Sequence, residues 1–150
     1  MSLGTVQKYN QFPDLVLRSA NRQWDDPAAG SAMFILATST YTPSPAHSTA
    51  ADLGANVITT GNGSPINVAT PVQTLLANVT WFSSGGANFG NPVTITAKYL
   101  VCVQPVVAGN YAATAKLLWY VDLSSGGGSL VVSAGSFNIL PPVNGWVDIT

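Results

Sequence analysis

Residues 92–104 constrain the fold more strongly than any other segment, because apolar and polar residues alternate along them. The positions predicted to point to one side are Val93, Ile95, Ala97, Tyr99, Val101 and Val103. Successive side chains of a strand point to opposite faces of a sheet, whereas a helix repeats about every 3.6 residues. The alternation therefore predicts one continuous strand whose two sets of side chains each occupy a single face.

Short apolar runs bounded by Gly, Pro, Asn and Ser lie on both sides of this segment. Further strands are predicted over residues 32–40, 56–60, 75–82, 114–123, 130–133, 136–140 and 146–149. The residues at 41–46, 61–65 and 124–128 are typical of loops and turns. About seven to nine short strands separated by turn signals predict a mainly β fold, either an antiparallel β-sandwich or a jelly-roll-like barrel.

Charge is concentrated near the N-terminus, where residues 8–26 hold six of the eleven Asp, Lys and Arg residues. Asp14 and Arg18 have the i, i+4 spacing that mildly stabilises a helix. We therefore expect a short helix or arm within residues 1–30. The β-sandwich would occupy residues 31–150, and the two parts would form a single compact domain.

The chain is poor in charge: 7% of its residues are charged, against about 25% in a typical soluble domain. Every acidic residue is Asp, and Ser, Thr, Asn and Gln together number 44. A net charge of −1 provides no field to attract nucleic acid or an anionic membrane. A neutral polar surface favours association, so we expect contact with other protein rather than with either of those partners.

The sequence lacks an apolar run of the roughly 18 residues that a membrane-spanning helix needs. Its first residues do not form a signal peptide. Cys102 is the only cysteine, so an internal disulfide cannot form. These features predict a protein that folds in the cytoplasm.

Reactive residues are scarce. His47 is the only histidine, and we interpret it as a loop residue that forms hydrogen bonds. A Cys102–His47 catalytic pair is the alternative, but a cysteine in mid-strand is more often a small buried hydrophobe. Asp25–Asp26 lacks the spacing of a calcium loop and is interpreted as a helix end. We expect no catalytic, cofactor or metal site and no small-molecule substrate.

Aromatic residues offer two interpretations. Trp119 is expected in the core with Leu117 and Val121. Trp146 falls opposite Val147 and Ile149 in the pattern, so we expect it to be exposed in a subunit contact. Alternatively, Trp146, Trp81 or Tyr41 would stack on sugar rings in a glycan-binding module.

Several segments follow one another in a characteristic order. The first are Tyr9-Asn10-Gln11-Phe12, Ala32-Met33-Phe34-Ile35-Leu36, Tyr41-Thr42-Pro43, His47 and Asp52. Then come Ile95-Thr96-Ala97-Lys98-Tyr99, Leu118-Trp119-Tyr120-Val121-Asp122, residues 132–139 and Asn144-Gly145-Trp146. In this order they resemble a family of small virion proteins of tailed bacteriophages. The chain departs from that family in having fewer charges and in Pro141-Pro142.

The resemblance implies a structural role in the virion. We expect a capsid decoration, or cement, protein that forms a homotrimer on the outer capsid surface and bridges subunits of the major capsid protein. The candidate interface residues are Tyr9, Phe12, Arg18, Arg22, Trp24 and Trp146. The two chain ends, residues 1–12 and 143–150, are expected to reach neighbouring subunits. The alternative is a tail fibre, spike or neck module that binds host glycan or another virion protein.

Overall fold

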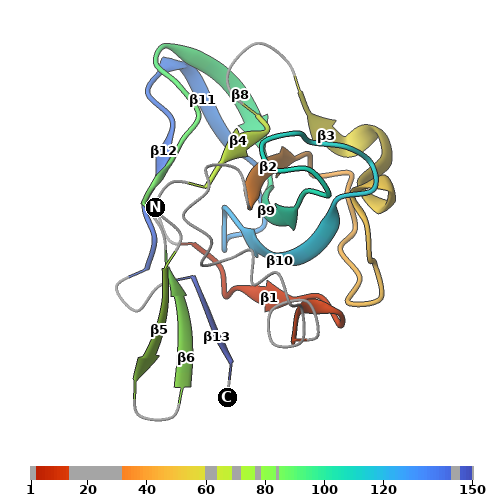
Figure 1. Cartoon of the computed structure of the whole chain (residues 1–150). Coiled ribbons are helices and arrows are strands. Elements are labelled where there is room, and N and C mark those ends of the chain that lie inside the picture. Colours follow the sequence, from red (N-terminus) through yellow and green to blue (C-terminus); the bar gives the residue numbers. More distant parts are fainter. Residues whose placement is uncertain are drawn as a thin grey trace.

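The computed structural model describes residues 3–13, 32–59, 64–68, 72–76, 79–83, 85–142 and 146–149. The fold is mainly β, with antiparallel strands, as expected (Figure 1). The largest sheet, called the main sheet below, has the order β1-β10-β9-β2-β3, and β4 also pairs with β2. Its strands are β1 (Gln7–Lys8), β2 (Met33–Ala37), β3 (Val57–Ile58), β4 (Ile66–Asn67), β9 (Tyr99–Gln104) and β10 (Lys116–Asp122).

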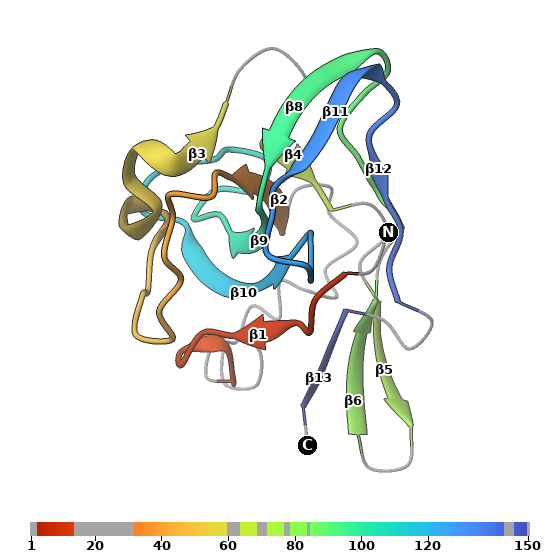
Figure 2. The same ribbon diagram turned by 180° about the vertical axis from the view of Figure 1, so that it is seen from behind.

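A long two-stranded ribbon packs against the main sheet. In its first part β8 (Val93–Ala97) pairs with β11 (Leu130–Gly135), and in its second part β7 (Ala87–Asn88) pairs with β12 (Asn138–Ile139). Between the two parts, Phe89 N–H donates to the Phe137 carbonyl at 2.8 Å and Phe137 N–H donates to the Gly90 carbonyl at 3.1 Å. Both views show the four strands as one curved strip, which is called the ribbon below (Figure 2).

A third sheet projects away from this body, with the order β13-β6-β5. Its strands are β5 (Val72–Leu76), β6 (Val79–Ser83) and β13 (Val147–Ile149), and β13 ends near the C-terminus (Figures 1 and 2). Leu76 pairs with Val79, so the chain reverses within two residues. The prediction of one strand over residues 75–82 is therefore wrong, because its apolar alternation runs straight through a hairpin.

The core lies between the main sheet and the ribbon, as in a β-sandwich. Phe34, Leu100 and Trp119 come from the main sheet and pack in one cluster with Ile95 and Phe137 from the ribbon. A second cluster covers the opposite face of the main sheet. It contains Ile35, Val101 and Leu117, together with Tyr41 and with Leu53 of the short helix η1 (Ala50–Asn56). The main sheet is therefore buried on both faces, which explains the continuous apolar run of β2.

The segment 92–104 is two strands rather than one. β8 has the predicted alternation, with Val93, Ile95 and Ala97 buried and the threonines between them exposed. At Lys98 the chain bends out of the ribbon and enters the main sheet. Beyond the bend, Val101 belongs to the second cluster instead of the first, so the predicted single face is wrong.

The N-terminal residues belong to the sandwich as far as the structure describes them. β1 pairs with β10, and Tyr9 and Phe12 are fully buried. The division into an arm or helix over residues 1–30 and a sandwich over residues 31–150 stays a prediction. Most of the predicted helix falls on residues 14–31, which lie outside the described residues. The described residues contain thirteen strands, of which eight have three residues or more, so the predicted seven to nine matches only the longer strands.

Candidate interaction surface

Trp146 is buried, contrary to the exposed position expected for it. Its side chain is 3% exposed and stacks on Trp119, with ring centroids 5.3 Å apart and an interplanar angle of 23°. Phe34 meets both indoles edge-on, at 5.6 Å from Trp119 and 5.5 Å from Trp146. Trp146 immediately precedes β13, so it anchors the projecting sheet to the core. The core position predicted for Trp119 is confirmed.

The other predicted interface residues divide into two groups. Tyr9 and Phe12 lie in the two core clusters and present no surface to a neighbour in this conformation. Their aromatic rings are large, and burial within the chain removes more apolar area from water than a partial contact would. Arg18, Arg22 and Trp24 lie outside the described residues. An interface role for those three stays a prediction.

His47 forms the loop hydrogen bond that was predicted for it. Nδ1 of His47 lies 2.9 Å from the Tyr41 hydroxyl, which lies 2.9 Å from the Tyr9 hydroxyl. When His47 is neutral and Nδ1 accepts, Tyr9 donates to Tyr41 and Tyr41 donates to His47, so each hydroxyl proton has an acceptor. Burial is the main cause that raises the pKa of Tyr9, and the hydrogen bond to Tyr41 adds to it. The chain of three side chains fixes the loop 41–48 on the main sheet.

Asp52 caps the N-terminus of η1. Its Oδ2 accepts hydrogen bonds from the backbone N–H of Thr49 at 2.9 Å and of Ser48 at 2.8 Å. These bonds favour the charged carboxylate and lower the pKa of Asp52. Asp52 is therefore a capping residue of the fold.

Cys102 lies on the opposite side of the main sheet from His47. The thiol belongs to the cluster between the main sheet and the ribbon, whereas the Tyr41 ring that His47 contacts belongs to the other cluster. Cys102 is fully buried, and burial raises the pKa of its thiol. The sheet therefore separates the two side chains, and the alternative of a Cys102–His47 catalytic pair does not fit this geometry. Tyr41 is also buried, so it presents no ring face for a sugar.

Lys98 is a buried lysine at the bend between the ribbon and the main sheet. Its Nζ lies 2.8 Å from Oδ2 of Asp122 and donates to the carbonyls of Ser124 at 3.2 Å and Gly128 at 3.0 Å. Three acceptors match the three N–H bonds of an ammonium group. Oδ1 of Asp122 also accepts from the backbone N–H of Ser124 at 2.8 Å. Lys98 therefore ties the turn 124–128 to the end of β8. A single Lys inside an apolar run was the sequence signal for this site.

The outer face of the ribbon is neutral and partly apolar. The exposed positions of its strands are occupied by residues such as Thr94, Thr96 and Ser133. Val131 on β11 is 64% exposed, and Leu140, just after β12, is 66% exposed. Neither residues 53–97 nor residues 123–147 contain an Asp, Glu, Lys, Arg or His, so all four strands of the ribbon are uncharged. These two charge-free runs are visible in the sequence, and their pairing makes the ribbon neutral.

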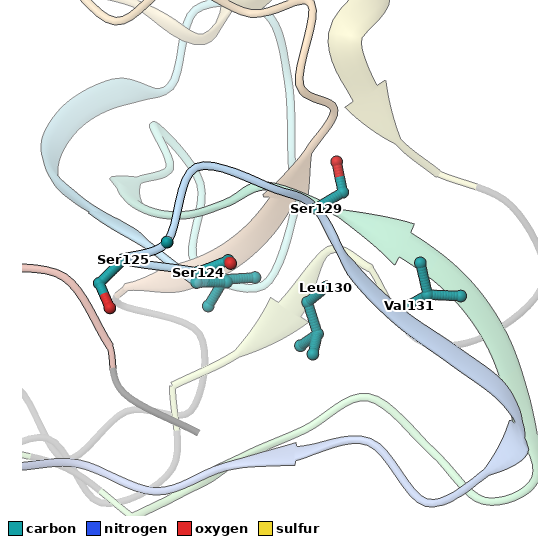
Figure 3. A pocket seen from close by; sticks show the side chains of 7 residues that line it. Ser124, Ser125, Ser129, Leu130 and Val131 are labelled. Carbon is teal, nitrogen blue, oxygen red and sulfur yellow. The ribbon is translucent and has the colours of Figure 1, made fainter.

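A shallow hollow lies beside the start of β11 (Figure 3). It has a volume of about 360 Å³ and is lined by Leu123, Ser124, Ser125, Gly126, Ser129, Leu130 and Val131. Its floor combines apolar side chains with serine hydroxyls, and the turn on one side of it is the turn held by Lys98. The hollow is large enough to receive one or two apolar side chains of a partner.

Among the described residues, no group of three or more His, Cys, Asp and Glu side chains is arranged to hold a metal ion. No helix in the same part of the chain is long and apolar enough to cross a membrane. Comparisons with protein-family models, with curated proteins and with solved structures find no match. The resemblance to phage virion proteins therefore stays an expectation.

Proposed function

We propose that this chain is a non-enzymatic structural protein of a tailed-phage virion, and that it decorates the capsid by bridging and stabilising major capsid protein subunits. The observation that carries the proposal is the uncharged ribbon, which exposes Val131 and Leu140 on the outside of the sandwich. A free domain in water gains solubility from surface charge. A surface without charge is better suited to burial against protein, where an unpaired charge would be costly.

The projecting sheet supports the same proposal. β5, β6 and β13 extend beyond the sandwich and provide a second set of strands for contacts with neighbours (Figure 1). The family resemblance supplies the phage setting, in which one protein is repeated over a lattice. A contact of roughly 800 Å² per partner is enough for a specific interface. A protein that binds only the assembled lattice stabilises that lattice by mass action.

The copy number of the protein in purified particles tests the location. A decoration protein is expected at hundreds of copies per particle, measured as the ratio of its band to the band of the major capsid protein. A ratio equivalent to a few copies, or to a few tens, would overturn the capsid assignment and favour the tail fibre, spike or neck alternative. Absence from the particle would overturn both.

An add-back experiment tests the mechanism. Purified protein is added to particles from which it has been removed, and the temperature at which the particles release their genome is measured. We expect the release temperature to rise with protein concentration and to saturate. Protein mixed with unassembled major capsid protein serves as the control and should not bind. Binding to the unassembled subunit with equal affinity would contradict the proposed preference for the lattice.

A further inference from the structure

We propose that the open edge of β11 pairs with the same edge of a second copy of this chain, in an antiparallel arrangement. The inference rests on the proposed contact function and names the partner. Among the described strands, β11 pairs only with β8, so its other edge has no partner strand there. An edge strand presents free backbone N–H and C=O groups that can pair with another strand.

The β11 edge lacks most of the usual protection against such pairing. Proteins block edges with lysines, prolines, inward-pointing charges or bulges. Leu130–Gly135 has no charged residue and no proline. Its one irregularity is at Ala134, which has φ of 49° within a shift of register between Val132 and Gly135. Residues 130–132, which precede the shift, therefore remain as a regular edge without charge or proline.

The β8 edge of the ribbon is less suited to pairing. Pro92 precedes β8 and has no N–H, and Lys98 follows it and donates its own N–H to the Ala37 carbonyl at 2.9 Å. Both ends of the β8 edge are therefore unavailable as donors. This difference selects β11 as the edge that a partner would join.

A second copy is the occupant that these features favour. Antiparallel pairing of two identical strands about a two-fold axis makes the contact self-complementary, because each residue i faces a residue j of the other copy and that copy's residue i faces j of the first. Because β11 is uncharged, this arrangement brings no like charges together. It places the exposed Val131 side chains of the two copies on the same side of the joined sheet.

The test compares the mass of purified wild-type protein with that of two variants by sedimentation velocity, at concentrations up to about 100 μM. Val131→Lys places a lysine on the edge strand. Val107→Lys is the matched control, because Val107 is 61% exposed, against 64% for Val131, and lies in a loop. We expect the wild type and Val107→Lys to have the same mass and Val131→Lys to have half of it. Equal masses for Val131→Lys and the wild type would overturn the proposal.

Two further measurements distinguish loss of β11 pairing from misfolding and from loss of particle binding. Circular dichroism shows whether Val131→Lys is folded; if it is not, Ser133→Lys, at another exposed position of β11, replaces it with the same expectation. The add-back experiment with particles is repeated for Val131→Lys. Particle binding by wild-type protein that does not self-associate would refute the β11 pairing and leave the capsid role intact. Self-association without particle binding would refute the capsid role and leave the β11 pairing intact.

Discussion

Replacement of Lys98 by Met keeps most of the buried aliphatic stem and removes the ammonium group. Three acceptors then lose their donor: the Asp122 carboxylate and the carbonyls of Ser124 and Gly128. Breaking a fully buried ion pair costs about 3–5 kcal/mol. Here the Asp122 side chain is 32% exposed and Gly128 is exposed, so water can replace part of the lost interaction. We expect the free energy of unfolding to fall by about 2–3 kcal/mol.

Urea unfolding followed by the fluorescence of the buried tryptophans measures this loss. The matched control is Lys116→Met on the exposed side of β10, which should change stability by less than about 0.5 kcal/mol. The double variant Lys98→Met/Asp122→Asn should recover about 1 kcal/mol relative to Lys98→Met, because no unpaired carboxylate remains. Asn also keeps an oxygen for the Ser124 N–H. A Lys98→Met variant as stable as Lys116→Met would refute the view that this ammonium group holds the turn.

Four further outcomes follow from the described contacts. Tyr41→Phe should lower the free energy of unfolding by about 1–3 kcal/mol, because it leaves the buried Tyr9 hydroxyl without its partner. Tyr9→Phe should lower it by less, and chemical denaturation compares the two variants. Trp146→Ala should lower the free energy of unfolding by about 3–5 kcal/mol in the same assay. Asp52→Ala should cost up to about 1 kcal/mol at neutral pH. Hydrogen bonds lower the pKa of Asp52 in the folded state. The stability difference between the wild type and Asp52→Ala should therefore have its full size above the unfolded-state pKa of about 3.9, and it should vanish as the pH falls through the folded-state pKa. Thermal unfolding at a series of pH values measures it. The Cys102 thiol should react with DTNB only after urea unfolding, and rapid reaction of the native protein would contradict its burial.

The mainly β class and most strands could be predicted because period-two alternation is a local property of the chain. The same property hides changes of partner. Alternation continues through the bend at Lys98, where the chain leaves one sheet for another and the buried face inverts. It also continues through the reversal between β5 and β6. In β10 the register shifts between Leu117 and Trp119, which places Leu117 and Trp119 in different clusters. Only the pairing of the strands, which the alternation does not encode, reveals these points.

Three of the residues expected at an interface are buried for a physical reason. Aromatic residues were chosen because they often anchor interfaces, but a domain with little charge gains most by burying them itself. Tyr9, Phe12 and Trp146 accordingly lie in the core. The proposed contact surface rests instead on the absence of charge from residues 53–97 and 123–147. Its meaning depends on the fold, because only the pairing of β8 with β11 and of β7 with β12 brings the two runs together as one surface.

The number of copies in the assembly separates two kinds of contact. Pairing of β11 with itself uses the same surface on both copies, so it is two-fold and closes as a pair. The expected homotrimer would instead need two different surfaces that meet head to tail around a ring. If a trimeric contact exists elsewhere on the chain, the β11 edge would join two trimers, and Val131→Lys would convert a hexamer into a trimer. If no such contact exists, the same substitution would convert a dimer into a monomer. An odd number of wild-type copies would be incompatible with β11 pairing in every copy.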